Sequence, residues 1–198
     1  MTRYRLEIIQ QPKRARMCGF GDKDRRLVGP LPILELKVLN DEDELMTNLY
    51  DVSSLIVHVD LWSEDCKRDC NVVVNPTSIP TAHSNEHQGA SVMSLGGPVN
   101  VRNLIGSTVS SSYQLKHMSG KPGVFFLFPD LSVRVEGVFR FRFSLWDVMR
   151  SWSGEHNNML TYVFSEPFTV YPPRNFPGMT GKSAMSTLRL YCKTNYDD

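Results

Sequence analysis

The sequence predicts a mainly β protein that folds as a β-sandwich, and three observations support this. Apolar and polar residues alternate strictly in four segments, a period of two that is typical of half-buried antiparallel strands. No segment shows a long apolar stripe at helical spacing, and only residues 43–49 could form one or two helical turns. Breaks rich in Gly, Pro, Asn and Asp separate roughly eight strand candidates, as expected for a sandwich.

The four alternating segments are predicted strands because each places its apolar residues on one face. In chain order these faces are Tyr4, Leu6 and Ile8; Leu34, Leu36 and Val38; Leu55, Val57, Val59 and Leu61; and Phe139, Phe141, Phe143 and Leu145. Shorter runs rich in Val, Phe and Tyr add strand candidates at residues 72–74, 123–128, 133–136 and 161–171. Strands with one apolar face favour two packed sheets.

A single domain over residues 1–198 is predicted. The chain has 198 residues with 41% hydrophobic content, enough for one large core, and it shows no internal repeat and no second core. Two stretches interrupt the strands. Residues 11–32 form a basic segment punctuated by Gly and Pro, and residues 75–97 form a segment rich in Ser, Pro, Gly and His without periodicity. Both are predicted loops, and loops of such length are usually functional or disordered.

The net charge of +1 conceals an uneven distribution of charge. Residues 1–28 hold eight basic and three acidic residues, a balance of +5, whereas residues 29–69 hold ten acidic and three basic residues, a balance of −7. Such asymmetry is a hint of a polyanionic partner. The small total argues against strong attraction of the whole surface to nucleic acid, so binding to a polyanion would have to come from one loop.

The sequence favours an intracellular, reducing compartment and predicts no membrane association. Residues 1–10 lack the apolar core of a signal peptide, and no run approaches the roughly 18 apolar residues of a membrane span. Four cysteines are too few for a disulfide-rich secreted scaffold. Two short basic clusters, residues 13–16 and 23–26, could serve as nuclear localisation signals.

Neither a metal site nor an active site is predicted. Cys66, Cys70, His83 and His87 have the bare spacing of a Cys2His2 zinc finger. However, Pro80 should interrupt the helix that carries the histidines of a finger, so we expect no metal. No nucleophile stands beside a base at a recognisable spacing. We therefore expect no enzyme activity, no cofactor and no small-molecule substrate.

The basic loop, residues 11–32, is the candidate binding site. Its candidate contact residues are Arg14, Arg16, Lys23, Arg25 and Arg26. Arginine pairs bidentately with phosphate oxygens or guanine edges, and the intervening glycines permit close approach of the backbone. Two interpretations stay open. The loop either contacts DNA or docks on the acidic residues 41–44 of its own domain.

Six motifs in a fixed order resemble the velvet-domain family, the fungal regulators of development, sporulation and secondary metabolism. They are Leu6-Glu7-Ile8-Ile9-Gln10-Gln11-Pro12 leading into Arg14-Ala15-Arg16-Met17-Cys18-Gly19; Lys23-Asp24-Arg25-Arg26; Val59-Asp60-Leu61-Trp62-Ser63; Asn103-Leu104-Ile105-Gly106-Ser107; Phe128-Pro129-Asp130-Leu131-Ser132-Val133-Arg134; and Phe176-Pro177-Gly178. The resemblance covers nearly the whole chain and is strongest to the spore-viability (VosA-like) branch.

This resemblance implies an immunoglobulin-like β-sandwich similar to the Rel/NF-kappaB DNA-binding domain, with long loops and one or two short helices. It also implies sequence-specific binding to double-stranded DNA, homodimers or heterodimers with other velvet proteins, and a location in the nucleus and cytoplasm. The DNA-contacting residues of the family fall on Lys23, Arg25 and Arg26. Arg14 and Arg16 are added here on the basis of charge and position alone.

The chain departs from the family pattern in two places. Gly21 stands where the spore-viability branch carries another basic residue, and residues 179–198 match the family's closing segment poorly. With the near-neutral total charge, these departures favour an alternative function. The chain could be a protein-interaction module that dimerises with a DNA-binding velvet partner without contacting DNA itself.

Overall fold

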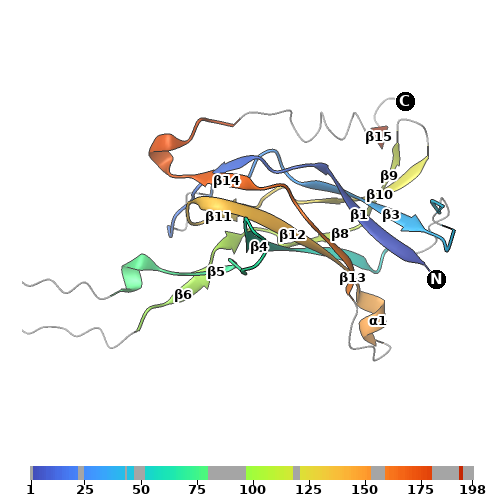
Figure 1. Ribbon diagram of the computed structural model, residues 1–198, viewed down its shortest axis with the longest axis horizontal. Coiled ribbons are helices and arrows are strands. Elements are labelled where there is room, and N and C mark those ends of the chain that lie inside the picture. The colour runs from blue at the N-terminus through green and yellow to red at the C-terminus, as the bar shows by residue number, and fades with distance from the viewer. Residues whose placement is uncertain are drawn as a thin grey trace, which may run out of the picture.

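Two β-sheets pack face to face in the computed structural model of the chain (Figure 1). The structure describes residues 2–21, 25–42, 44–46, 52–79, 97–117, 121–152, 159–179 and 192–193. Within these residues the helical segments are short: α1 (Val148–Trp152) and the 3-10 turns η1 (Pro76–Ser78) and η2 (Pro173–Asn175). In the part of the chain described, no helix is long and apolar enough to cross a membrane.

The first sheet has five antiparallel strands. Their order is β1 (Arg3–Gln10), β3 (Ile33–Leu39), β10 (Pro122–Leu127), β9 (Tyr113–His117) and β15 (Cys192–Lys193). The second sheet has six strands, ordered β2 (Arg14–Arg16), β14 (Phe168–Tyr171), β12 (Gly137–Asp147), β4 (Leu55–Ser63) and β8 (Val109–Ser111), with β13 (Met159–Phe164) also paired to β12. Two small ribbons join β5 (Val72–Val74) to β6 (Asn100–Arg102), and β7 (Leu104–Ile105) to β11 (Ser132–Val133).

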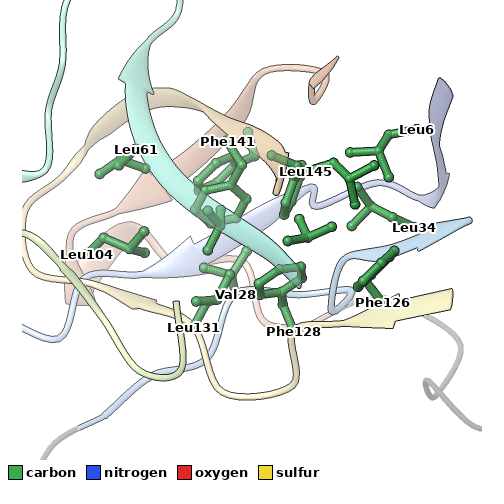
Figure 2. Close-up of a cluster of buried hydrophobic side chains, with 14 of the residues drawn as sticks. Leu6, Val28, Leu34, Leu61, Leu104, Phe126, Phe128, Leu131, Phe141 and Leu145 are labelled. Atoms are coloured by element: carbon green, nitrogen blue, oxygen red, sulfur yellow. The ribbon is translucent and has the colours of Figure 1, made fainter. Parts of the chain in front are cut away.

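The four alternating segments are strands, as predicted, and the structure extends three of them by a few residues. Their apolar faces meet in one core drawn from both sheets (Figure 2). Leu34 and Phe126 come from the first sheet, while Phe141 and Leu145 come from β12 of the second, and all four are buried. The ring centroid of Phe128, directly after β10, lies 5.2 Å from that of Phe143 across the interface between the sheets. The prediction of an all-β sandwich is therefore confirmed.

The predicted strand over residues 161–171 is wrong in one respect, because the structure divides it into β13 and β14. The break lies at Ser165–Pro167, where Pro167 has no N–H to donate to a strand ladder. β14 pairs with the start of β12, and β13 pairs with its end. One long strand thus has two successive partners on the same side.

The basic loop is less irregular than the sequence predicts. Within it, β2 pairs in parallel with β14, and Ala15 at the centre of β2 is fully buried. The helical turns expected at residues 43–49 are not found in the part described, where Leu45 instead bridges Leu39 in an antiparallel arrangement. Residues 43 and 47–49 lie outside the described residues. The short helix α1 was not predicted.

The two divergent stretches are described only in part. In the predicted loop 75–97, Asn75 caps η1 by accepting a hydrogen bond from the Thr77 N–H at 3.1 Å, while residues 80–96 lie outside the described residues. In the tail, β15 pairs with β9 within the first sheet. Residues 180–191 and 194–198 likewise lie outside the part described.

Candidate nucleic-acid interface

The tip of the basic loop, residues 19–27, is fastened at both ends to one segment of the chain. At its start, Cys18 N–H donates to Val133 O at 3.0 Å and Gly19 N–H donates to Arg134 O at 3.0 Å. At its end, Val28 N–H donates to Leu131 O at 2.8 Å. Residues 131–134 include β11, so both ends of the tip are attached to the same short segment of the chain.

A second set of hydrogen bonds fixes β2 against the returning end of the loop. Gly29 O accepts from the N–H groups of Lys13 and Arg14, both at 3.0 Å, and Gly29 N–H donates to Arg14 O at 2.8 Å. On the other side of β2, Met17 N–H donates to Tyr171 O at 2.9 Å. The loop therefore has a rigid base, which is where binding residues are commonly mounted.

The structure places four of the five candidate residues at this base or on the tip. Ala15 points into the core, so its neighbours Arg14 and Arg16 lie on the outer side of β2, both partly exposed. Arg25 and Arg26 are exposed, just before Leu27 bridges Ser132. Lys23 lies outside the described residues.

Arg134 is a residue of this site that reasoning from the sequence did not select. Its Nη1 donates to Gly19 O at 2.9 Å and its Nε donates to Arg102 O at 2.9 Å. Its guanidinium carbon lies 5.9 Å from the centroid of the Phe20 ring. The sequence does place Arg134 at the end of a family motif, but its contacts are with residues far away in the chain.

The side chain of buried Asn103 hydrogen-bonds to the backbone of Arg134 and its neighbour Val135. The Asn103 side-chain oxygen accepts from Arg134 N–H at 3.2 Å and from Val135 N–H at 3.3 Å, and its Nδ2 donates to Cys70 O at 3.0 Å. Since a buried amide left without partners would be costly, this network holds the turn that carries Arg134 in one conformation.

Of the acidic residues 41–44, the described Asp41, Glu42 and Glu44 lie at the opposite end of β3 from the basic loop. Gln10, near the loop, pairs with Ile33 at the start of β3, whereas Arg3 pairs with Leu39 at its end. A strand of this length separates the two ends by about 20 Å. Among the described residues, no ion pair joins Arg14 or Arg25 to an acidic side chain. Arg14 is partly exposed to solvent and Arg25 is exposed.

A small polar hollow of about 250 Å³ lies beside the second sheet, and its lining includes His58, Asp60, Asn71, Arg102 and Thr108. His58 Nδ1 lies 3.5 Å from Asp60 Oδ2, and Asn71 Nδ2 donates to Asp60 Oδ1 at 3.2 Å. Burial raises the pKa of Asp60, but the hydrogen bonds from His58 and Asn71 and the charges of His58 and Arg142 lower it below its ordinary value.

The described residues contain no group of three or more His, Cys, Asp and Glu side chains that could hold a metal ion. Cys66 and Cys70 are partly buried free thiols in the turn after β4. His83 and His87 lie outside the part of the chain described, so the zinc-finger spacing stays a sequence pattern alone.

Comparison with known proteins gives the site its context. The chain matches the family described as "Velvet factor" over residues 4–188. It is 36% identical to "Sexual development regulator umv3" of Mycosarcoma maydis, over 89% of this chain and 40% of that protein. It is 31% identical to a velvet complex subunit of Aspergillus flavus (92% and 74%) and 31% identical to "Spore development regulator RYP2" of Ajellomyces capsulatus (92% and 40%). The chain thus spans between two fifths and three quarters of the length of these relatives, whose names describe regulators and a member of a complex.

Proposed function

Since the chain belongs to the velvet family of fungal regulatory factors, we propose that it is a transcription regulator that binds double-stranded DNA through its basic loop. It acts as a homodimer or as a heterodimer with another velvet protein, in the nucleus as well as the cytoplasm. Relatives named as regulators of sexual and spore development support a role in fungal development and sporulation, and the family resemblance extends the proposal to secondary metabolism.

One observation carries the proposal, namely a basic loop with a rigid base and exposed arginines on its tip. Arg14 and Arg25 have no ion-pair partner among the described residues, and Arg25 and Arg26 are exposed on the tip. A planar guanidinium can pair with two phosphate oxygens or with the O6 and N7 atoms of guanine. We assign contacts with base edges and phosphate oxygens to the arginines of the loop and a phosphate contact to Lys23.

Dimerisation increases the number of contacts with DNA beyond those that a single loop can make. The net charge of +1 gives weak attraction between DNA and the whole surface, so one loop alone provides few contacts. Two copies of the loop on a dimer contact DNA at two half-sites, which multiplies affinity through the effective concentration of the second site. The relative from Aspergillus flavus, whose name makes it part of a velvet complex, supports a partner from the same family.

The alternative function is a protein-interaction module that joins a DNA-binding velvet partner without touching DNA. Gly21, which lacks a side chain where a further cation would strengthen the loop, and the small net charge favour it. At the level of the family, neither alternative is an enzyme, in line with the regulatory names of the relatives.

A selection of bound sequences from a pool of random double-stranded DNA separates the two functions. The pool is exposed to the chain alone, and in parallel to the chain mixed with a velvet protein from the same organism. Enrichment of a motif by the chain alone supports direct DNA binding. The interaction module is supported instead if a motif is enriched only when the partner is present and the partner alone enriches the same motif.

A further inference from the structure

We propose that Arg134 is the positioning residue that holds the tip of the basic loop in its DNA-binding conformation, an inference that rests on the proposed function. Two reciprocal hydrogen bonds join Arg134 and Gly19. Gly19 N–H donates to Arg134 O at 3.0 Å, and Gly19 O accepts from Arg134 Nη1 at 2.9 Å. Both polar groups of the first residue of the tip are therefore bound to one partner.

The conformation of Gly19 explains why this residue needs to be held. Gly19 has a φ of +65°, in the left-handed region that glycine adopts without strain, and the chain changes direction there. An unrestrained glycine would sample many backbone conformations. The reciprocal hydrogen bonds select one of them and so fix the direction in which the chain leaves the sheet after Gly19.

The next residue adds a contact with the same side chain. The guanidinium carbon of Arg134 lies 5.9 Å from the Phe20 ring centroid, within the range of a cation–π interaction. Its Nε meanwhile donates to Arg102 O at 2.9 Å on β6. Arg134 therefore joins the tip of the loop to the β5–β6 ribbon, two segments that no backbone hydrogen bond within the described residues connects directly.

Only arginine can make this set of contacts. The Nε and Nη1 donors of a guanidinium lie in a fixed plane and reach two carbonyl oxygens on different segments, while the face of the plane stays free for the ring. A lysine ammonium keeps the charge but is a single point donor. Since Nε and Nη1 of Arg134 are engaged by the carbonyl oxygens of Arg102 and Gly19, we assign this side chain the role of orienting the loop.

Arg140 provides a matched control. Its Nε donates to Glu64 O at 2.8 Å and its Nη1 donates to Ser165 O at 2.6 Å, so it also links two backbone segments through two carbonyl oxygens. Neither of these segments belongs to the basic loop. The variants Arg134→Lys and Arg140→Lys thus remove the same two side-chain hydrogen bonds from two places, and only Arg134 contacts the tip of the loop.

Two measurements test the proposal. Amide hydrogen exchange of the free protein reports on the loop without DNA, and we expect exchange at Gly19, whose N–H donates to Arg134 O, to accelerate about tenfold in Arg134→Lys and to stay unchanged in Arg140→Lys. Affinity for the selected DNA, measured across a salt series, should fall about tenfold in Arg134→Lys while the slope against salt stays the same. Phe20→Ala, which removes the ring alone, should give about a two- to fivefold loss.

Three outcomes separate the possibilities. If Arg134→Lys binds DNA and exchanges amides as the natural chain does, Arg134 does not position the loop and the proposal is overturned. If Arg134→Lys and Arg140→Lys lose affinity equally, the effect is general destabilisation, which overturns it as well. If exchange accelerates only in Arg134→Lys but the natural chain binds no DNA, Arg134 does position the loop while the proposed function fails.

Discussion

The backbone N–H of Phe141 donates a hydrogen bond of 3.0 Å to the side-chain oxygen of Ser165. This contact lies where β12 exchanges one partner strand for another, between its pairing with β14 and its pairing with β13. Ser165 is fully buried, and its hydroxyl in turn donates to Glu166 O at 2.7 Å. The Ser165 side chain thus takes the place of a backbone acceptor for the Phe141 N–H, where β12 faces the break between β14 and β13.

Replacing Ser165 with Ala should lower the free energy of unfolding by about 1–3 kcal/mol, because the Phe141 N–H would be buried without an acceptor. Urea denaturation followed by tryptophan fluorescence measures the change. Ser111→Ala, at an exposed position of β8, is the control and should stay within about 0.5 kcal/mol of the natural chain. Equal stability of the two variants would mean that the buried hydrogen bond is not needed at the break.

The core between the sheets should be sensitive to the loss of Phe141. Its fully buried ring lies 4.5 Å from the Phe168 ring centroid and 5.8 Å from that of Phe143. Phe141→Ala should lower the free energy of unfolding by about 3–5 kcal/mol, since it removes buried apolar area and leaves a cavity. Val138→Ala, at an exposed position of the same strand, should cost about 0.5 kcal/mol or less. A small loss at Phe141 would contradict the shared core.

Asp60 should make the stability of the domain dependent on acidic pH. Its folded-state pKa is lowered, so the folded chain favours the carboxylate, and the stabilisation is complete above the unfolded pKa of about 4 and is lost as the pH falls through the folded pKa. Since the surrounding His58, Asn71 and Arg142 are partly exposed to water, the contribution is about 1 kcal/mol. Asp60→Asn should therefore be less stable than the natural chain at pH 7, with a difference that shrinks below about pH 4. A difference independent of pH would show that the charge of Asp60 is not involved.

The long strands of the sandwich could be predicted from the sequence because their evidence is local. The alternation in residues 33–39 marks β3 with its observed ends, and the Phe residues of 139–145 mark the centre of β12. The family, predicted from ordered motifs, is confirmed. A regulator of spore development stands among the relatives, in line with the predicted branch.

The short elements could not be predicted because their stability comes from distant partners. β2 has three residues and no period of its own, and it exists because β14, more than 150 positions away, offers a parallel edge. Arg134 likewise hydrogen-bonds to Gly19, which lies 115 positions earlier in the sequence. Charge in the sequence selects Arg14, Arg16, Arg25 and Arg26 as candidates, but it does not select Arg134, which we propose as the positioning residue of their loop.

The dependence of DNA affinity on salt in the variant Arg25→Ala/Arg26→Ala tests the central claim most directly. Lys67→Ala/Arg68→Ala is its control, because it removes two adjacent, exposed cations from the turn after β4 and leaves the loop intact. We expect the loop variant to lose at least about tenfold in affinity and its slope of log affinity against log salt to flatten by about 0.9 for each lost phosphate contact. The control should keep the affinity and slope of the natural chain. If both variants give the same affinity and slope, the basic loop does not bind DNA.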